Sequence, residues 1–181
     1  TITALSEFAM SQIPVFSAEK ASKIKPIDFN EPLAGQVSHI KGIGDLASDL
    51  NQIKESIQNT MISNLGIEIT DAGEDFVCGK MPVDTRTIQS FGILHGGASV
   101  ALAESLGSIA GSMKVDSNNE VVMGIEINAN HLKSAREGWV YGKAIPIKIG
   151  KKIQVWEIKV TNKENELICI SRLTLAVIKK R

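Results

Sequence analysis

One short segment, residues 88–105 with the sequence IQSFGILHGGASVALAES, holds the residue types best suited to chemistry. It contains the only glycine pair of the chain, Gly96 and Gly97, followed by a run of small and apolar residues. Glu104 is the one charged residue between His95 and Lys114. A carboxylate in such a run has no solvated, charged stripe to join, so it needs polar partners of the kind that functional sites provide.

The residues around Glu104 predict acyl-transfer chemistry. The first backbone N–H groups of a helix are unpaired donors with a positive dipole behind them, and glycines let a carbonyl group approach them closely. The side-chain amide of Gln89 adds a donor just before this turn. Donors at Gly96 and Gln89 would hold a carbonyl oxygen, while Glu104 attacks the carbonyl carbon or activates water.

The elements that must position these residues predict an α+β fold with a largely antiparallel sheet. The helix from Gly97 to about Met113 is rich in Ala, Ser and Gly, so a curved sheet can wrap it closely. Before it come a strand pair with a turn at Asp71–Gly73 and an amphipathic helix that carries Leu46, Leu50, Ile53, Ile57 and Met61. Four strand-like runs follow, at residues 121–132, 139–147, 153–161 and 167–178. This segregated order is typical of a sheet packed on one central helix.

Residues 1–45 differ from the rest of the chain. They carry three prolines and no sustained periodicity, which predicts an extension ahead of a domain at residues 46–181. The first residues have no basic region and no sustained apolar run, so we expect no signal peptide. Glu104 interrupts the apolar run at residues 91–111, which argues against a membrane span.

Composition excludes some partners. Lys plus Arg and Asp plus Glu number 20 each, so no overall basic field attracts nucleic acid or an anionic membrane. Aromatic residues make up 4% of the chain, too few for a surface that stacks single-stranded bases. A net charge of zero also leaves self-association unopposed.

The cysteines and histidines predict neither metal binding nor a disulfide framework. Cys78 and Cys169 lie far apart, and His39, His95 and His131 have no ligand spacing. We therefore expect two free cysteines in a cytoplasmic protein, with no metal and no cofactor.

Three stretches, MPVDTRTIQSFGILHGGASVALAES, GIEINANHLKSAREG and GKKIQVWEI, resemble the hotdog-fold acyl-CoA thioesterases. The resemblance covers residues 46–178 and is strongest to the branch that acts on 1,4-dihydroxy-2-naphthoyl-CoA in menaquinone biosynthesis. It implies a curved sheet wrapped around the central helix, homodimers that pair into homotetramers, and active sites at subunit interfaces. Residues 1–45 have no counterpart in the resemblance.

The resemblance also implies roles for individual residues. Glu104 corresponds to the catalytic carboxylate, acting as nucleophile or general base, and Gly96 to the backbone donor. Gln89 corresponds to the amide that orients the thioester or the attacking water. His95 corresponds to a histidine beside the carbonyl group, and Ser108 to a hydroxyl near the catalytic acid.

Two cationic loops, HLKSAR and KIGKK, fall where the relatives hold coenzyme A, and His131 corresponds to a residue facing the acyl pocket. Local lysines suit phosphate groups in a chain without an overall positive field, although solvated turns would have the same composition. The predicted substrate-binding residues are His131, Leu132, Lys133, Ser134, Lys148, Ile149, Gly150, Lys151 and Lys152.

The sequence thus predicts hydrolysis of an aromatic acyl-CoA, of the dihydroxynaphthoyl or hydroxybenzoyl type, to the acid and coenzyme A. A broad-specificity proofreading thioesterase and a non-catalytic acyl-CoA-binding module are the alternatives. A hydratase or dehydratase would need a carboxylate and a histidine in acid and base roles across the acyl chain, and no motif for that pair is present.

Overall fold

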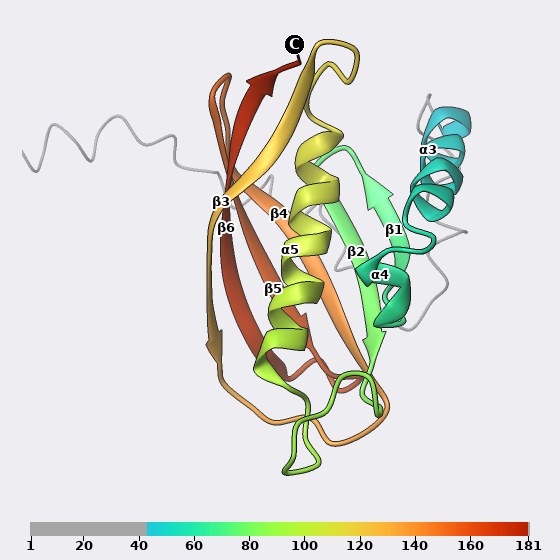
Figure 1. Ribbon diagram of the computed structural model, residues 1–181, viewed down its shortest axis with the longest axis vertical. Coiled ribbons are helices and arrows are strands. Elements are labelled where there is room, and N and C mark those ends of the chain that lie inside the picture. The colour runs from blue at the N-terminus through green and yellow to red at the C-terminus, as the bar shows by residue number, and fades with distance from the viewer. Residues whose placement is uncertain (1–42, 181) are drawn as a thin grey trace, which may run out of the picture. The chain divides into compact units, whose positions relative to one another are not determined.

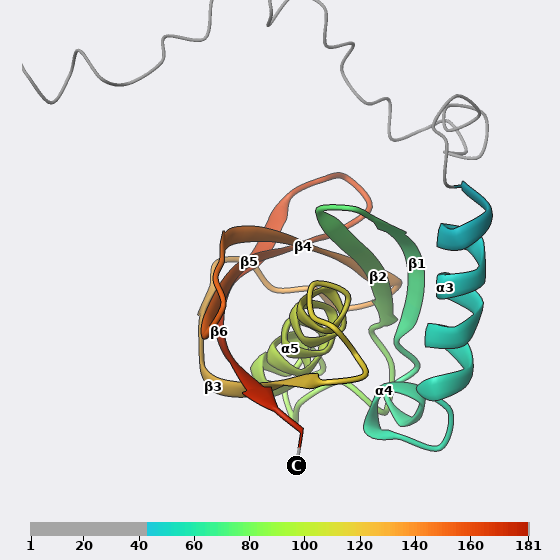
Figure 2. The same cartoon turned by 90° about the horizontal axis from the view of Figure 1, so that it is seen from above.

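Helix α5 (Gly96–Ser112) lies within the concave face of a single curved sheet in the computed structural model, which describes residues 43–180 (Figure 1). Neighbouring strands are all antiparallel, in the order β1-β2-β4-β5-β6-β3. Seen along the helix, the sheet curves around it and leaves one side open (Figure 2). The strands are β1 (Glu68–Gly73), β2 (Phe76–Pro82), β3 (Glu120–His131), β4 (Trp139–Ile149), β5 (Ile153–Thr161) and β6 (Leu167–Lys179).

This architecture confirms the predicted α+β class and the helix wrapped by an antiparallel sheet. The central helix begins and ends one residue earlier than the sequence pattern indicated. The four strands that follow it lie within two residues of the predicted runs at both ends. Alternating burial along β5 accounts for this accuracy, because one face of the strand packs on α5 and the other does not.

Small residues let the sheet approach α5 closely. A methyl group placed on Gly107 would lie 2.6 Å from Cδ2 of Leu173, and one on Gly111 would overlap Cδ1 of Leu175. Larger side chains that precede these glycines on the helix fill the core, and Leu102 and Leu106 are fully buried. The glycines cost helix propensity, but they allow the β6 side chains to pack directly against the helix.

The C-terminal end of α5 is fastened to β5 through a buried hydrogen-bond chain. The Gln154 side-chain amide donates to the carbonyl oxygen of Gly111 at 3.2 Å, and the indole N–H of Trp156 donates to the Gln154 side-chain oxygen at 3.0 Å. One of the carbonyl groups near the helix end is thus satisfied inside the core rather than by water.

The predicted amphipathic helix extends too far at its C-terminal end. Helix α3 (Ile43–Ser56) ends before Ile57, and the separate short helix α4 (Met61–Asn64) follows. Thr60 caps α4 by accepting a backbone hydrogen bond through its hydroxyl group, which starts a new helix instead of continuing the old one. Ile57 is still buried, but Met61 is 64% exposed and lies outside the core.

The predicted turn at Asp71–Gly73 is also displaced. Strand β1 continues to Gly73, which pairs with Phe76, so Glu74 and Asp75 form the turn. A side chain at Gly73 would overlap the Phe76 ring. The glycine therefore serves packing between the two strands, and the turn follows it.

The proposed extension at residues 1–45 lies outside the described residues except for its last three, and it stays a prediction. Among the described helices, none combines the length and the apolar character that crossing a membrane would require.

We expect Gly111→Ala to lower the free energy of unfolding by about 1 kcal/mol, although alanine is the better helix former. The added methyl group would meet Cδ1 of Leu175 and the Gln154 oxygen, both held in the core. Urea unfolding measures the effect, and Ser112→Ala on the exposed neighbouring position is the control. A Gly111→Ala protein as stable as the parent would contradict close packing as the reason for this glycine.

Candidate active site

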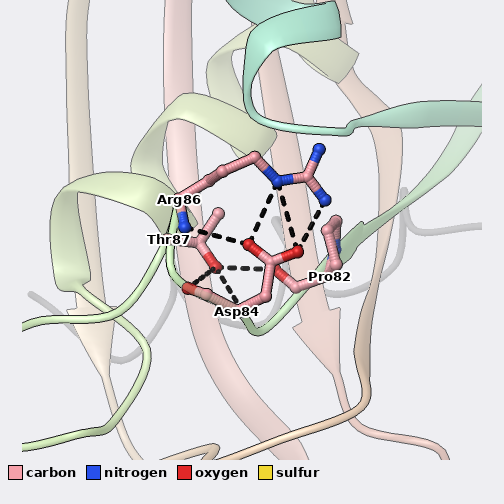
Figure 3. Close-up of polar contacts among 4 residues, drawn as sticks. All are labelled: Pro82, Asp84, Arg86 and Thr87. Atoms are coloured by element: carbon pink, nitrogen blue, oxygen red, sulfur yellow. Dashed lines mark hydrogen bonds and ion pairs between the residues drawn. The ribbon is translucent and has the colours of Figure 1, made fainter.

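The loop that joins β2 to α5 is anchored by Thr87, which is only 1% exposed (Figure 3). Its hydroxyl group donates to the carbonyl oxygen of Pro82 at 2.7 Å and accepts from the backbone N–H of Asp84 at 3.1 Å. The Thr87 carbonyl oxygen accepts from the backbone N–H of His95 at 2.8 Å. Thr87 therefore ties the end of β2 to the residue that precedes α5.

An exposed ion pair shapes the same loop. The Asp84 carboxylate accepts hydrogen bonds from the Arg86 side chain, the shortest at 2.6 Å, and from the Arg86 backbone N–H at 2.9 Å (Figure 3). The side-chain bonds from Arg86 are the main cause that lowers the pKa of Asp84, and the backbone bond adds to them. Arg86 also lies against Gly66, whose φ of +70° favours glycine.

Gln89 stands at the start of a tight loop. The backbone N–H of Gln89 donates to the carbonyl oxygen of Ile93 at 2.8 Å, and that of Gly92 donates back to Gln89 at 2.9 Å. Gly92 has a φ of +69°, a conformation that glycine adopts without strain. The side-chain amide of Gln89 makes no hydrogen bond to any described residue, so both its donor and its acceptor are available to a ligand.

His95 caps the N-terminus of α5. Its Nδ1 accepts from the Gly97 N–H at 2.8 Å, which leaves the proton of the neutral ring on Nε2. The carbonyl oxygen of His95 accepts from the N–H groups of Ala98 and Ser99. Of the first four helix N–H groups, only that of Gly96 has no partner in the described part of the chain. The predicted backbone donor is therefore unpaired.

A pocket of about 320 Å³ opens beside this donor and brings several predicted residues together. Gln89, Gly96 and the segment 131–134 all line it. The His131 ring stands directly over Gly96, because a methyl group on that glycine would lie 2.9 Å from the ring Nε2. The sequence did not indicate four further lining residues, Ile93, Leu94, Ser99 and Ile168. Of these, only Ser99 could have been identified from the sequence, because its position three residues after Gly96 places it on the same helix face.

Lys133, the cation of this pocket, is already paired. Its ammonium group lies 2.5 Å from a Glu166 carboxylate oxygen. Hydrogen bonds from Lys133 first, and from Asn162 second, lower the pKa of Glu166. A phosphate group at Lys133 would have to share this ammonium group with the carboxylate.

Glu104 and Ser108 do not line the pocket. They lie on a stripe of exposed and half-exposed residues along the open side of α5, formed by Gly97, Val100, Ala101, Glu104, Ser105, Ser108, Ile109 and Ser112. The expectation that the helix has no open face for a carboxylate is therefore wrong for the single chain. The Glu104 carboxylate has no partner among the described residues, and its Oε1 would lie 3.3 Å from a methyl group placed on Gly124 of β3.

The two predicted coenzyme A loops lie near opposite ends of α5. Residues 131–134 adjoin Gly96 at the N-terminal end of α5. Residues 148–152 comprise the end of β4 and the turn to β5, close to Gln154, which binds the C-terminal end of α5 at Gly111. Lys148, Lys151 and Lys152 are exposed and form no ion pair with any described residue.

Neither cysteine is among the residues that line the pocket. Cys78 and Cys169 are both free, and burial raises the pKa of the Cys78 thiol to about 11, against the opposing influence of Lys143. Burial also raises the pKa of Cys169. Within residues 43–180, no three His, Cys, Asp or Glu side chains are grouped so that they could hold a metal ion.

A helix wrapped by a sheet, with an unpaired donor in a pocket at its N-terminus, is an arrangement suited to binding a carbonyl group. Residues 91–169 match the sequence pattern of the thioesterase superfamily. A 1,4-dihydroxy-2-naphthoyl-CoA hydrolase of Escherichia coli is 48% identical over 121 residues, which cover 67% of this chain and 88% of the relative. The chain belongs to this family and is a thioester hydrolase with the hotdog fold.

Solved structures agree with this assignment. A thioesterase of Haemophilus influenzae superposes with a TM-score of 0.70 at 51% identity, covering 72% of this chain and 90% of that one. A mutant thioesterase of Pseudomonas aeruginosa superposes with a TM-score of 0.71 at 42% identity, covering 72% and 94%.

We expect Thr87→Val to lower the free energy of unfolding by about 1–3 kcal/mol, because the Pro82 carbonyl and the Asp84 N–H lose a buried partner. The loop that carries Gln89 should loosen, and kcat should fall with it. Chemical unfolding and thioesterase kinetics measure the two effects. Thr174→Val is the matched control, since this half-buried hydroxyl has no hydrogen bond to a described residue. Equal behaviour of both variants would contradict the anchoring role.

Proposed function

We propose that the protein hydrolyses an aromatic acyl-CoA to the free acid and coenzyme A. The observation that carries this proposal is the pocket where the unpaired Gly96 N–H and the free Gln89 amide meet an apolar wall. Such a wall suits a flat apolar acyl group, and the two donors suit its thioester carbonyl. The name of the Escherichia coli relative supports an acyl group of the dihydroxynaphthoyl or hydroxybenzoyl type.

In the proposed reaction, the Gly96 N–H binds the thioester carbonyl oxygen, with the positive end of the α5 dipole behind it. The Gln89 amide adds a second contact to that oxygen or to the attacking water. Glu104 either takes a proton from water, whose oxygen bonds to the carbonyl carbon, or attacks that carbon itself. The carbon–sulfur bond then breaks, and the coenzyme A thiolate leaves and takes up a proton. Where Glu104 itself attacks, this step leaves the acyl group on the carboxylate as an anhydride, and water then hydrolyses the anhydride to release the acid and restore Glu104. The reaction consumes only water, so we propose that it needs no metal and no cofactor.

We propose further that each site combines two copies of the chain. Glu104 lies eight residues after Gly96, which is about 12 Å along the helix and too far for both to act on one carbonyl group. Glu104 also faces the open side of α5, and the edge strand β3 beside it exposes Met123 and Ile125 by 54% and 57%. A second copy that covers this face would place its own Glu104 over the first copy's pocket. A homodimer is thus the smallest proposed active unit, and pairs of dimers would give a tetramer.

The same arrangement accounts for the separation of the two cationic loops. In a two-fold dimer whose helices run in opposite directions, the N-terminal end of one α5 adjoins the C-terminal end of the other. Residues 131–134 of one copy and 148–152 of its partner would then contact the same coenzyme A. Lys148, Lys151 and Lys152, exposed in the single chain, would supply the phosphate contacts that the paired Lys133 supplies less well.

The proposed roles of His95 and Ser108 follow from their places. His95 would orient the Gly96 N–H by capping the helix through its Nδ1. Ser108 lies one turn after Glu104 on the same face and would bind the carboxylate or the attacking water. The free thiols favour a cytoplasmic location, which we also propose.

We expect Glu104→Gln to reduce kcat for aromatic acyl-CoA hydrolysis at least about 10²-fold, because an amide neither accepts the proton nor attacks the carbon. Circular dichroism and size-exclusion chromatography should show an unchanged fold and assembly. Glu74→Gln in the exposed β1–β2 turn is the matched control. Undiminished hydrolysis by the Glu104→Gln protein would refute the proposed mechanism.

Subunit complementation tests the shared site. Gln89→Ala should lower the rate about 10²–10³-fold on its own, as for other removed carbonyl-binding donors. Random pairing of equal amounts of Gln89→Ala and Glu104→Gln chains should then restore about a quarter of the parent activity. Half of the dimers are then mixed, and each mixed dimer holds one intact site out of two. Activity no higher than the sum of the two separate variants would show that both residues act within one chain.

A further inference from the structure

Ser99 is an unusual buried polar residue. Four polar residues are buried in the described part of the chain, namely Thr87, Ser99, Gln154 and Ser171. Thr87 and Gln154 donate to backbone carbonyl groups, and Ser171 contacts the Cys169 thiol. The Ser99 hydroxyl alone has no hydrogen-bond partner among the described residues, although the residue is 2% exposed.

The Ser99 hydroxyl group is not sealed inside the core. Every fully buried side-chain oxygen or nitrogen of the described residues has a hydrogen-bond partner, so the unpaired Ser99 hydroxyl group keeps some exposed surface. Ser99 lines the pocket that holds Gly96, and almost all of its remaining surface is buried. A hydroxyl group kept from protein partners in this way is costly unless a ligand or water pairs with it.

Helix geometry places the hydroxyl near the carbonyl-binding donor. Ser99 lies three residues after Gly96, so the two are neighbours on one helix face. Helix side chains lean toward the N-terminus, which brings the Ser99 hydroxyl back toward Gly96 from its own position about 4.5 Å further along the axis. Ligand atoms bound by these two residues must therefore be close to each other.

We propose that Ser99 determines substrate specificity by hydrogen bonding an oxygen substituent next to the thioester carbonyl. This inference rests on the proposed function, in which the Gly96 N–H holds that carbonyl oxygen. On an aromatic acyl group, the ring carbon adjacent to the carbonyl-bearing one carries the substituent that Ser99 reaches. A hydroxyl group on the far side of the ring points away from α5 and into the rest of the pocket, out of reach of Ser99.

Three thioesters test the proposal: benzoyl-CoA, 2-hydroxybenzoyl-CoA and 4-hydroxybenzoyl-CoA. The parent protein should favour 2-hydroxybenzoyl-CoA over benzoyl-CoA in kcat/KM, and Ser99→Ala should reduce this ratio about tenfold. The ratio of 4-hydroxybenzoyl-CoA to benzoyl-CoA should be the same in both proteins. Ser56→Ala, which removes an exposed hydroxyl group on α3, should change neither ratio.

Binding measured without turnover separates the two proposals. Calorimetric Kd values for the three thioesters are compared between the Glu104→Gln protein and the Glu104→Gln, Ser99→Ala double variant. A tenfold loss confined to 2-hydroxybenzoyl-CoA supports the role of Ser99, even if the parent protein hydrolyses none of the three and the proposed function fails. If the Ser99→Ala change leaves the Kd for 2-hydroxybenzoyl-CoA relative to benzoyl-CoA unchanged, the proposal is overturned. An equal loss of affinity for all three thioesters also overturns it, because that result indicates a purely structural role.

Discussion

The close approach of α5 to the sheet is the constraint on which the rest of the structure depends. Gly107 and Gly111 leave no room for a side chain between the helix and β6. Gly79 of β2 is similar, because a methyl group placed on it would lie 2.7 Å from Cδ2 of Leu106. With the helix backbone this close to the strands, the sheet can curve around it and bury Leu102 completely. A helix with larger side chains on these positions would push the strands away and open the core.

That constraint also decides where chemistry can occur. Most faces of α5 are occupied by the sheet, so only the N-terminus and the open stripe remain available (Figure 2). The N-terminus provides the unpaired Gly96 N–H, and the stripe provides Glu104. The two groups of the proposed acyl-transfer site thus lie on different parts of the same helix, and the proposed second copy would bring one of each together.

The sequence was informative wherever local patterns determine structure. Alternation along β5 and the small residues of α5 predicted those elements and their packing, and the glycine pair predicted the donor at Gly96. It was misleading at Met61, where the capping hydroxyl of Thr60 overrides the helical spacing of apolar residues. Pocket residues such as Ile168 could not be predicted, because their role depends on a contact between distant segments that carries no local signal.

Glu104 shows a different limit of sequence reasoning. Its isolation among apolar residues predicted that it is not an ordinary surface charge, yet the single chain leaves it exposed. Both observations hold together if the apolar surroundings belong to an interface rather than to a core. The neighbouring side chains of the stripe are small or apolar, and the adjacent edge strand exposes Met123 and Ile125. An edge strand with exposed apolar side chains favours coverage by a partner. A partner that covers β3 would also remove water from the Glu104 carboxylate, next to the bound thioester.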